Sequence, residues 1–441
     1  MRRGALWIVL VAGLWAAAQV APDYAARGRA TVAAMAAGKF AAVESGYSAK
    51  MAAALPAGRL ADIWKQVQAQ VGAYQEVEKA SVVEAGGLHT AVLACRFAKA
   101  TLNVVLAFDG DGRIAGLRFA PAAVPSASGW APPAYAHPAA FHEEQVRVGT
   151  APWTLPGTLT LPSGAGPFPA VVLVPGSGPE DGDETIGPNK PFKDLAWGLA
   201  SRGIAVLRYV KRTRQYGGRF AGHLEGYTVK QGTVDDARAA VALLSQRADI
   251  QPRAIYLLGH SEGGYLAPRI AQRDASIAGI ISLAGSTRPL LASVLDQYRY
   301  FEGLKPSAGL EQEIQATEKA QALANSPALK ATDAVAVAGT ALPGSYFLDL
   351  RGYDPGATAA GLKIPILVLQ GGRDYQVTLK DFDGWKQALG KDPRAAFQYF
   401  PDLDHLLGVG GTPPSPADYA RPGHVAEPVI EAIANWMGAK G

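Results

Sequence analysis

A run of apolar residues that ends in a Gly-x-Ser-x-Gly turn restricts the fold of this chain more than any other feature. Residues 254–258 predict a buried strand, Gly259 to Gly263 form the turn, and residues 265–272 can continue as a helix. The two glycines leave room where the chain nearly touches itself, and the turn places the hydroxyl of Ser261 on a sharp, exposed corner. In an open α/β sheet such a corner lies at the carboxyl ends of the strands, where ligands bind. We therefore predict that Ser261 is a nucleophile.

From about residue 143 onward, predicted strands alternate with predicted helices. A hairpin opens this region at 145–161, and apolar strands are expected at 170–174, 204–209, 254–258, 277–283, 365–370 and 396–400. Uninterrupted apolar strands separated by helices indicate a mostly parallel sheet that is covered on both faces. Residues 286–345 break the rhythm with an Ala/Leu/Gln-rich helical pattern. We interpret this insertion as a helical cap over the site; an additional packing subdomain is the alternative.

A serine hydroxyl is a poor nucleophile at neutral pH, so it needs a general base and a carboxylate that orients the base. In a strand-turn-helix architecture of this kind the chain order is serine, then acid, then histidine. Asp374 directly follows the predicted strand at 365–370, and we predict that it is the acid. Asp381 and Asp383 fall in a predicted helix and are interpreted as surface charges.

The base should follow the last strand of the sheet. His405 stands five residues after the predicted strand at 396–400, and we predict that it is the base. His424, at the start of the last predicted helix, is the main alternative candidate for the base. His260 precedes the nucleophile directly, and we expect it to have a packing role.

Two backbone N–H groups should hold the oxyanion that forms when the serine attacks a carbonyl group. The residue after the nucleophile, Glu262, supplies one of them, and its side chain is expected to face solvent or the rim of the pocket. The second should come from the loop after the strand at 170–174, which reads Pro-Gly-Ser-Gly-Pro at 175–179. Within this loop we predict the N–H of Ser177.

The region before residue 143 has a different organisation. Helical patterns come first, and strand-like runs follow at 77–84, 89–97, 101–108 and 114–119, so residues 22–120 predict a small α+β domain with an antiparallel sheet. Residues 121–142 contain five prolines and predict a Pro/Ala-rich linker to the domain at 143–441. Cys95, the single cysteine, lies in an alternating run and is expected at a buried strand position.

Residues 1–21 predict a removable export signal. Two arginines precede an apolar, uncharged stretch at 4–18, and small residues at its end fit a cleavage site. The apolar core is only about 15 residues long and polar sequence follows it, so we predict cleavage after Ala18 or Ala21 rather than an integral membrane anchor. A chain that is exported and cannot form an internal disulfide fits a bacterial periplasm or secretion from the cell.

Composition excludes some partners. The chain has 441 residues, 49% of them hydrophobic and 18% charged, which is typical of a globular protein with more than one domain. The net charge is +4, and no cluster of Lys and Arg alternates with aromatic residues, so nucleic acid is not an expected partner. The densest basic run, at 211–214, is interpreted as a solvated loop or a rim of the substrate site.

With these residues placed, the chain resembles bacterial α/β-hydrolase esterases of the serine-aminopeptidase-like branch, in particular members with a small nuclear-transport-factor-like domain before the hydrolase. Besides the predicted triad, the resemblance rests on the segments at 175–179, 187–190, 208–212 and 349–355. It implies hydrolysis of carboxylic esters, usually with short acyl chains, and no metal or cofactor. Two positions depart from the family pattern: Pro175 replaces a common His, and Val210 replaces a common Asp, which could remove an ion pair with a neighbouring base.

We therefore predict an exported serine hydrolase with an α/β-hydrolase fold, whose partner is a small-molecule ester. An aminopeptidase or amidase with the same triad is an alternative, and it would need a carboxylate to bind the substrate amine, for which Glu262 and Glu225 are available. A noncatalytic binding protein on the same scaffold is a further alternative, against which the complete triad argues.

Overall fold

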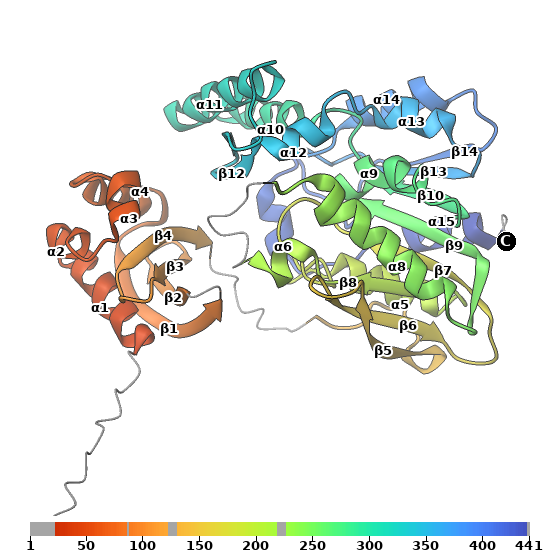
Figure 1. The fold of residues 1–441 in the computed structure, drawn as a ribbon, viewed down its shortest axis with the longest axis horizontal. Coiled ribbons are helices and arrows are strands. Elements are labelled where there is room, and N and C mark those ends of the chain that lie inside the picture. Colours follow the sequence, from red (N-terminus) through yellow and green to blue (C-terminus); the bar gives the residue numbers. More distant parts are fainter. Residues whose placement is uncertain (1–22, 86–87, 122–129, 218–225, 439–441) are drawn as a thin grey trace, which may run out of the picture. The chain divides into compact units, whose positions relative to one another are not determined.

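The computed structural model describes residues 23–85, 88–121, 130–217 and 226–438, which fold into two compact units (Figure 1). The first unit ends at Ala122 and the second begins at Ala123. The predicted signal peptide at 1–21 lies outside the described residues, as do positions 122–129 of the predicted linker. Among the helices in the described ranges, none has the length and apolar character needed to cross a membrane.

Within its described residues, the first unit packs helices against one antiparallel sheet, as expected of a small α+β domain. The helices are α1 (Tyr24–Ala36), α2 (Phe40–Glu44), α3 (Ala49–Ala54) and α4 (Arg59–Val71). The strands β1 (Tyr74–Ala85), β2 (Leu88–Phe97), β3 (Thr101–Phe108) and β4 (Ile114–Pro121) pair in chain order.

The core of this unit lies between the helices and the sheet. Gly28 of α1 lies so close to β2 that a Cβ there would come within 2.9 Å of the Leu93 side chain. Trp64 of α4 contacts Phe97 and Phe119 with ring centroids 5.7 and 5.9 Å apart. Cys95 is fully buried on β2, and this burial raises the pKa of its thiol to about 11, so it remains a protonated core residue at neutral pH.

In the described part of the second unit, eight strands form one mixed sheet. They are β5 (Phe141–Val148), β6 (Leu155–Pro162), β7 (Phe168–Val174), β8 (Ala205–Tyr209), β9 (Ile250–His260), β10 (Gly279–Leu283), β13 (Ile366–Gly371) and β14 (Ala395–Phe400). Their order in the sheet is β14-β13-β10-β9-β7-β8-β6-β5. The strands from β8 to β14 run parallel, and β6 is antiparallel to both β5 and β8.

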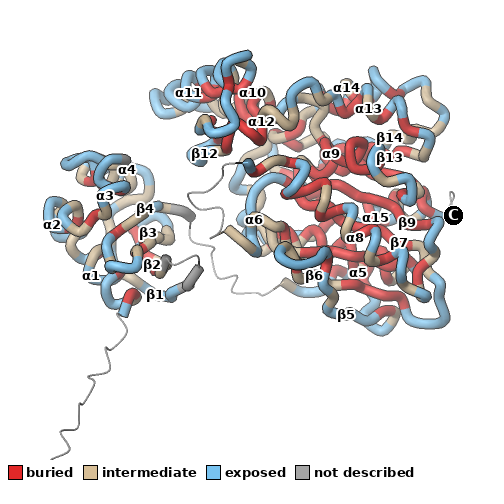
Figure 2. Tube along the Cα trace, viewed as in Figure 1, coloured by how far each residue is buried: buried red, intermediate tan, exposed pale blue. Residues whose placement is uncertain are grey.

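Helices cover both faces of this sheet, and Figure 2 shows its central strands as buried. Because side chains alternate along a strand, Val172 of β7 enters one core and its neighbour Val171 the other. The first core includes residues of α8 (Asp235–Ser245), α9 (Glu262–Ala271), α13 (Pro355–Gly361) and α14 (Leu379–Leu389). The second includes residues of α5 (Pro191–Ala200) and α15 (Glu427–Gly438). A π-helical turn, η2 (Lys230–Val234), leads directly into α8 ahead of β9.

The insertion between β10 and β13 is not purely helical, and this part of the expectation is wrong. It contains α10 (Leu290–Leu304), α11 (Ala308–Asn325), the hairpin β11 (Ala334–Val337) and β12 (Thr340–Pro343), and α12 (Gly344–Leu350). Along β11 burial alternates, since Val335 and Val337 are buried whereas Ala334 and Ala336 are exposed. Leu291, Val294 and Ala320 join the two valines in a core of its own.

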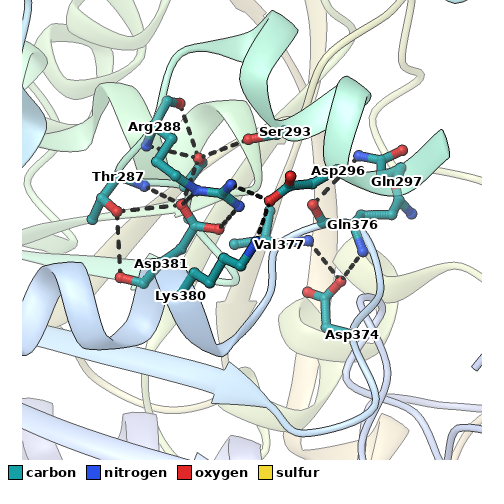
Figure 3. Close-up of polar contacts among 12 residues, drawn as sticks. Thr287, Arg288, Ser293, Asp296, Gln297, Asp374, Gln376, Val377, Lys380 and Asp381 are labelled. Atoms are coloured by element: carbon teal, nitrogen blue, oxygen red, sulfur yellow. Dashed lines mark hydrogen bonds and ion pairs between the residues drawn. The ribbon is translucent and has the colours of Figure 1, made fainter. Parts of the chain in front are cut away.

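The interpretation of Asp381 as a surface charge is also wrong, because its side chain is fully buried. Figure 3 shows Asp381, in the first turn of α14, facing Thr287 and Arg288 at the start of the insertion. Its carboxylate accepts hydrogen bonds from Thr287 N at 3.0 Å and from Arg288 Nε and Nη2 at 3.0 and 2.7 Å. Asp296 of α10 receives Arg288 Nη1 at 2.6 Å and Lys380 Nζ at 2.9 Å. This network therefore ties the base of the insertion to the sheet domain.

Replacing Asp381 by Ala should strongly destabilise the second unit, since it leaves the Arg288 charge and a backbone N–H without their buried partner. We expect a loss of about 3–5 kcal/mol in the free energy of unfolding. Asp383 lies on the exposed side of the same helix, and Asp383→Ala should change this free energy by less than about 0.5 kcal/mol. Denaturant unfolding of both variants tests this, and equal losses would contradict it.

Candidate active site

Ser261 occupies the strand-to-helix turn expected of it, between β9 and α9. Its backbone has φ 53° and ψ −114°, a conformation that is unfavourable for a residue with a side chain. The Ser261 N–H donates to the carbonyl of Leu283 at 3.0 Å, which fixes the turn against β10. A Cβ on Gly259 would collide with the carbonyl of Gly263, and a Cβ on Gly263 with that of Val174. Glycine is therefore required on both sides of the serine.

Asp374 and His405 lie together at the carboxyl ends of β13 and β14, and both side chains are buried. Nδ1 of His405 is 2.7 Å from Oδ2 of Asp374. Oδ1 of Asp374 accepts the N–H groups of Gln376 at 2.8 Å and Val377 at 2.9 Å, which hold the carboxylate in place (Figure 3). With Nδ1 as the donor to Asp374, Nε2 of a neutral His405 is the proton acceptor.

His260 links the base to the nucleophile. It directly precedes Ser261, its Nε2 lies 2.9 Å from the carbonyl oxygen of His405, and the two imidazole rings are 4.7 Å apart. The structure thus brings the loop of His405 to the turn that carries Ser261.

His424, the competing base, lies elsewhere. Its Nδ1 is 3.1 Å from Asp194 of α5, and both residues line a cavity of about 360 Å³. Asp404 and Leu406, on either side of His405, form another part of the cavity wall. His424 is therefore engaged by a different carboxylate from the one that contacts His405.

His260 has more than the packing role expected of it. Its Nδ1 lies 2.9 Å from Oε2 of Glu184, outside hydrogen-bond geometry, and neither atom has a hydrogen-bond partner among the described residues. Burial alone would lower the pKa of His260, but the charge of Glu184 and the carbonyl of His405 outweigh it and raise the pKa to about 9. His260 and Glu184 therefore form a buried ion pair at neutral pH.

Both predicted oxyanion donors belong to segments next to Ser261. Glu262 is the first residue of α9, where the N–H groups have no partner within the helix. Ser177 is exposed in the loop after β7, and the preceding Gly176 lies against the nucleophile, since a Cβ on Gly176 would be 3.3 Å from that of Ser261. Pro175 is buried ahead of this glycine.

The structure contradicts exposure to solvent for two charges near this loop, each of which was expected in solvent or at the rim of the site. The side chain of Glu262 pairs with Lys211, Oε2 to Nζ, at 2.7 Å. Lys211 is only 3% exposed. Val210 therefore does not leave the neighbouring lysine without an ion pair.

Within the described ranges, no group of three or more His, Cys, Asp or Glu residues is arranged to hold a metal ion.

Comparison with known proteins matches two parts of the chain to family models. Residues 171–421, more than half of the chain, match the model described as the alpha/beta hydrolase family. The chain belongs to this family. Residues 30–117, in the small unit, match a family described as a protein of unknown function, DUF3887.

The chain is 37% identical over 392 residues to "Esterase EstD" of Thermotoga maritima, a match that covers 88% of this chain and 89% of the relative. Among solved structures it is similar to Est1E from Butyrivibrio proteoclasticus, with a TM-score of 0.44, 15% identity and coverage of 67% of this chain and 98% of that one. It is also similar to the Pyrococcus horikoshii acylaminoacyl peptidase, with a TM-score of 0.45, 15% identity and coverage of 82% and 51%. At these TM-scores the two structural likenesses support no conclusion about the chain.

Sequence reasoning missed Glu184, and it named Lys211 only as part of a basic run, without its burial or its partners. Lys211 follows the carboxyl end of β8, and the site lies at this edge of the sheet. Its position in the sequence therefore indicated that it lies near the site. Glu184 lies in the loop between β7 and α5, where no local pattern distinguishes it from its acidic neighbours.

The His260–Glu184 pair should make stability depend on pH. The pKa of His260 is about 9 in the folded chain and about 6.5 when unfolded, so its charge stabilises fully below about pH 6.5, and this effect is lost as the pH rises through 9. We expect the difference in free energy of unfolding between the native chain and His260→Gln to shrink steadily over that interval. Denaturant unfolding at several pH values measures it, with exposed His137→Gln as the control; a difference that is independent of pH would contradict the assignment.

Proposed function

We propose that the chain is an exported serine hydrolase that cleaves carboxylic esters, with a preference for short acyl chains. The observation that carries this proposal is the 2.7 Å contact between Nδ1 of His405 and Oδ2 of Asp374, at the same sheet edge as the strained turn of Ser261. The 37% identity to a protein named as an esterase supports the ester as substrate.

In the proposed reaction His405 Nε2 takes the proton of the Ser261 hydroxyl as the oxygen attacks the ester carbonyl. Asp374 keeps the imidazole oriented and stabilises the imidazolium that forms. The N–H groups of Ser177 and Glu262 hold the negative oxygen of the tetrahedral intermediate. His405 then gives its proton to the departing alcohol, and an acyl-enzyme on Ser261 remains.

Water completes the cycle. His405 removes a proton from a water molecule, which attacks the acyl-enzyme, and the same two N–H groups hold the second oxyanion. The proton returns to the Ser261 oxygen as the carboxylic acid leaves. This sequence requires no redox step and no group other than the residues named.

Two contacts of Glu262 favour an ester over an aminopeptidase substrate. An amine-binding carboxylate near the serine would have to be free, but Glu262 is occupied by Lys211 and by the hydroxyl of Tyr346 at 2.6 Å. Glu225, the other expected amine ligand, lies outside the described residues.

The mature protein should hydrolyse p-nitrophenyl acetate and butyrate faster than the octanoate and laurate esters. Ser261→Ala should lower kcat by about 10³-fold or more, because the remaining groups bind and polarise the substrate but cannot form the acyl-enzyme. Steady-state kinetics on the four esters measure both effects.

Ser163→Ala, at an exposed position distant in the chain from the turn, serves as the matched control and should keep native rates. Equal activity of native enzyme and Ser261→Ala would refute the nucleophile, and faster cleavage of an amino-acyl anilide than of esters would favour the amidase alternative.

We also propose that residues 1–21 direct export. When the full chain is produced in a bacterial host, protein recovered outside the cytoplasm should begin after Ala18 or Ala21. N-terminal sequencing of the periplasmic and medium fractions tests this, and protein that retains residues 1–21 in the cytoplasm would contradict it.

A further inference from the structure

We propose that Lys211 is a positioning residue for the oxyanion site, because it fixes the peptide whose N–H, that of Ser177, faces the developing oxyanion. The inference rests on the proposed function, since it concerns the same serine chemistry. It assigns Lys211 and its partner Glu262 to transition-state stabilisation, although neither side chain is expected to touch the substrate.

The first step is the geometry of one peptide group. Nζ of Lys211 donates to the carbonyl oxygen of Gly176 at 2.5 Å. This carbonyl and the N–H of Ser177 belong to the same peptide plane, and in a trans peptide they point in opposite directions. An ammonium group that holds the carbonyl on one side therefore sets the direction of the N–H on the other.

The preceding peptide is held as well. The N–H of Gly176 donates to Oε1 of Glu184 at 2.7 Å, and the other oxygen of this carboxylate lies beside His260. Gly176 has no side chain with which to pack, and its conformational freedom is large. Two buried charges on its two peptide groups replace the packing that a larger residue would supply.

Lys211 is itself held in one position. Its ammonium group is 2.7 Å from Oε2 of Glu262, and Oε1 of that carboxylate accepts the hydroxyl of Tyr346 at 2.6 Å. Burial raises the pKa of Glu262, but Lys211 and Tyr346 outweigh it and keep the pKa below its ordinary value, so the carboxylate is ionised. The pair thus stays charged where it contacts the loop.

The same pair connects the two oxyanion donors. Glu262 offers its backbone N–H to the oxyanion while its side chain holds Lys211, and Lys211 holds the peptide of Ser177. The Lys211–Glu262 ion pair therefore positions both donors. The positive charge of Lys211 also polarises the peptide between Gly176 and Ser177, so that its N–H is a stronger donor. Such an arrangement acts mainly when negative charge develops on the substrate oxygen.

The test compares Lys211→Met, which keeps most of the side-chain volume, with the native enzyme on p-nitrophenyl butyrate. We expect kcat to fall by about 10- to 100-fold while KM changes by less than about twofold, since the lost alignment acts on the transition state. The Ki of a trifluoromethyl ketone analogue of the butyrate, which forms an oxyanion on Ser261, should rise by the same factor as kcat/KM falls.

Arg247→Met is the control, since it removes an ion pair to Asp249 near the start of β9, at the opposite end of the strand from Ser261. It should leave kcat and Ki unchanged. A Lys211→Met enzyme that folds with native kcat and Ki overturns the inference, and so does a change confined to thermal stability or to KM.

If circular dichroism shows that Lys211→Met does not fold, Glu262→Gln carries the test, because it preserves shape and removes the charge that holds Lys211. A fall in kcat of about threefold or more with an unchanged KM supports the inference, and a native kcat overturns it. Ser261→Ala measured beside these variants separates the two proposals: full activity there refutes the serine mechanism itself, whereas an inactive Ser261→Ala with a native Lys211→Met refutes only the role of Lys211.

Discussion

At the turn of Ser261 the chain approaches itself so closely that only glycine fits on either side of the serine, and the geometry of the sheet's carboxyl edge follows from this turn. Gly263, in the first turn of α9, lies against the carbonyl of Val174 at the end of β7. This contact depends on the register in which β7 pairs with β9, where Val174 lies opposite Gly259. The same turn gives Ser261 a positive φ, which local residue preference does not favour. The hydrogen bond from its N–H to Leu283 and the packing of α9 hold it there. The parallel strands around β9 therefore both create the strained corner and bring the loops of the acid and the base beside it.

The residues on either side of Ser261 contact two different parts of the site. His260 reaches the carbonyl of His405 and pairs with Glu184, while Glu262 pairs with Lys211. Glu184 and Lys211 in turn bind the two peptide groups of Gly176, so one short segment of chain contacts the base and the oxyanion loop through charged side chains. The base of the insertion is attached through another buried charge, that of Asp381, which pairs with Arg288.

The sequence was sufficient to predict which residues lie at the carboxyl ends of the strands, because this depends only on their order in the chain. Asp374 and His405 each follow a strand of recognisable apolar pattern, and in a parallel sheet the ends of those strands must lie at one edge. Asp381 was not predictable in the same way: its helix reads as amphipathic, and its partners lie about 90 positions earlier in the chain. Lys211 and Glu262 were likewise expected in solvent or at the rim of the site, because a charged side chain is exposed by default and only tertiary contacts can bury it.

Buried ion pairs are a poor source of stability, since desolvation offsets most of the attraction between the charges. Stability alone therefore does not explain why two of them flank the Ser261 turn, at Glu184–His260 and Lys211–Glu262. Apolar side chains of similar volume would fill the same space, but they could bond neither the N–H nor the carbonyl of Gly176. An unbonded glycine peptide would rotate among several orientations, and each would aim the Ser177 N–H differently. The two ion pairs therefore serve mainly to fix the orientation of the Gly176 peptide groups. The stability of the unit comes from the apolar faces of the sheet.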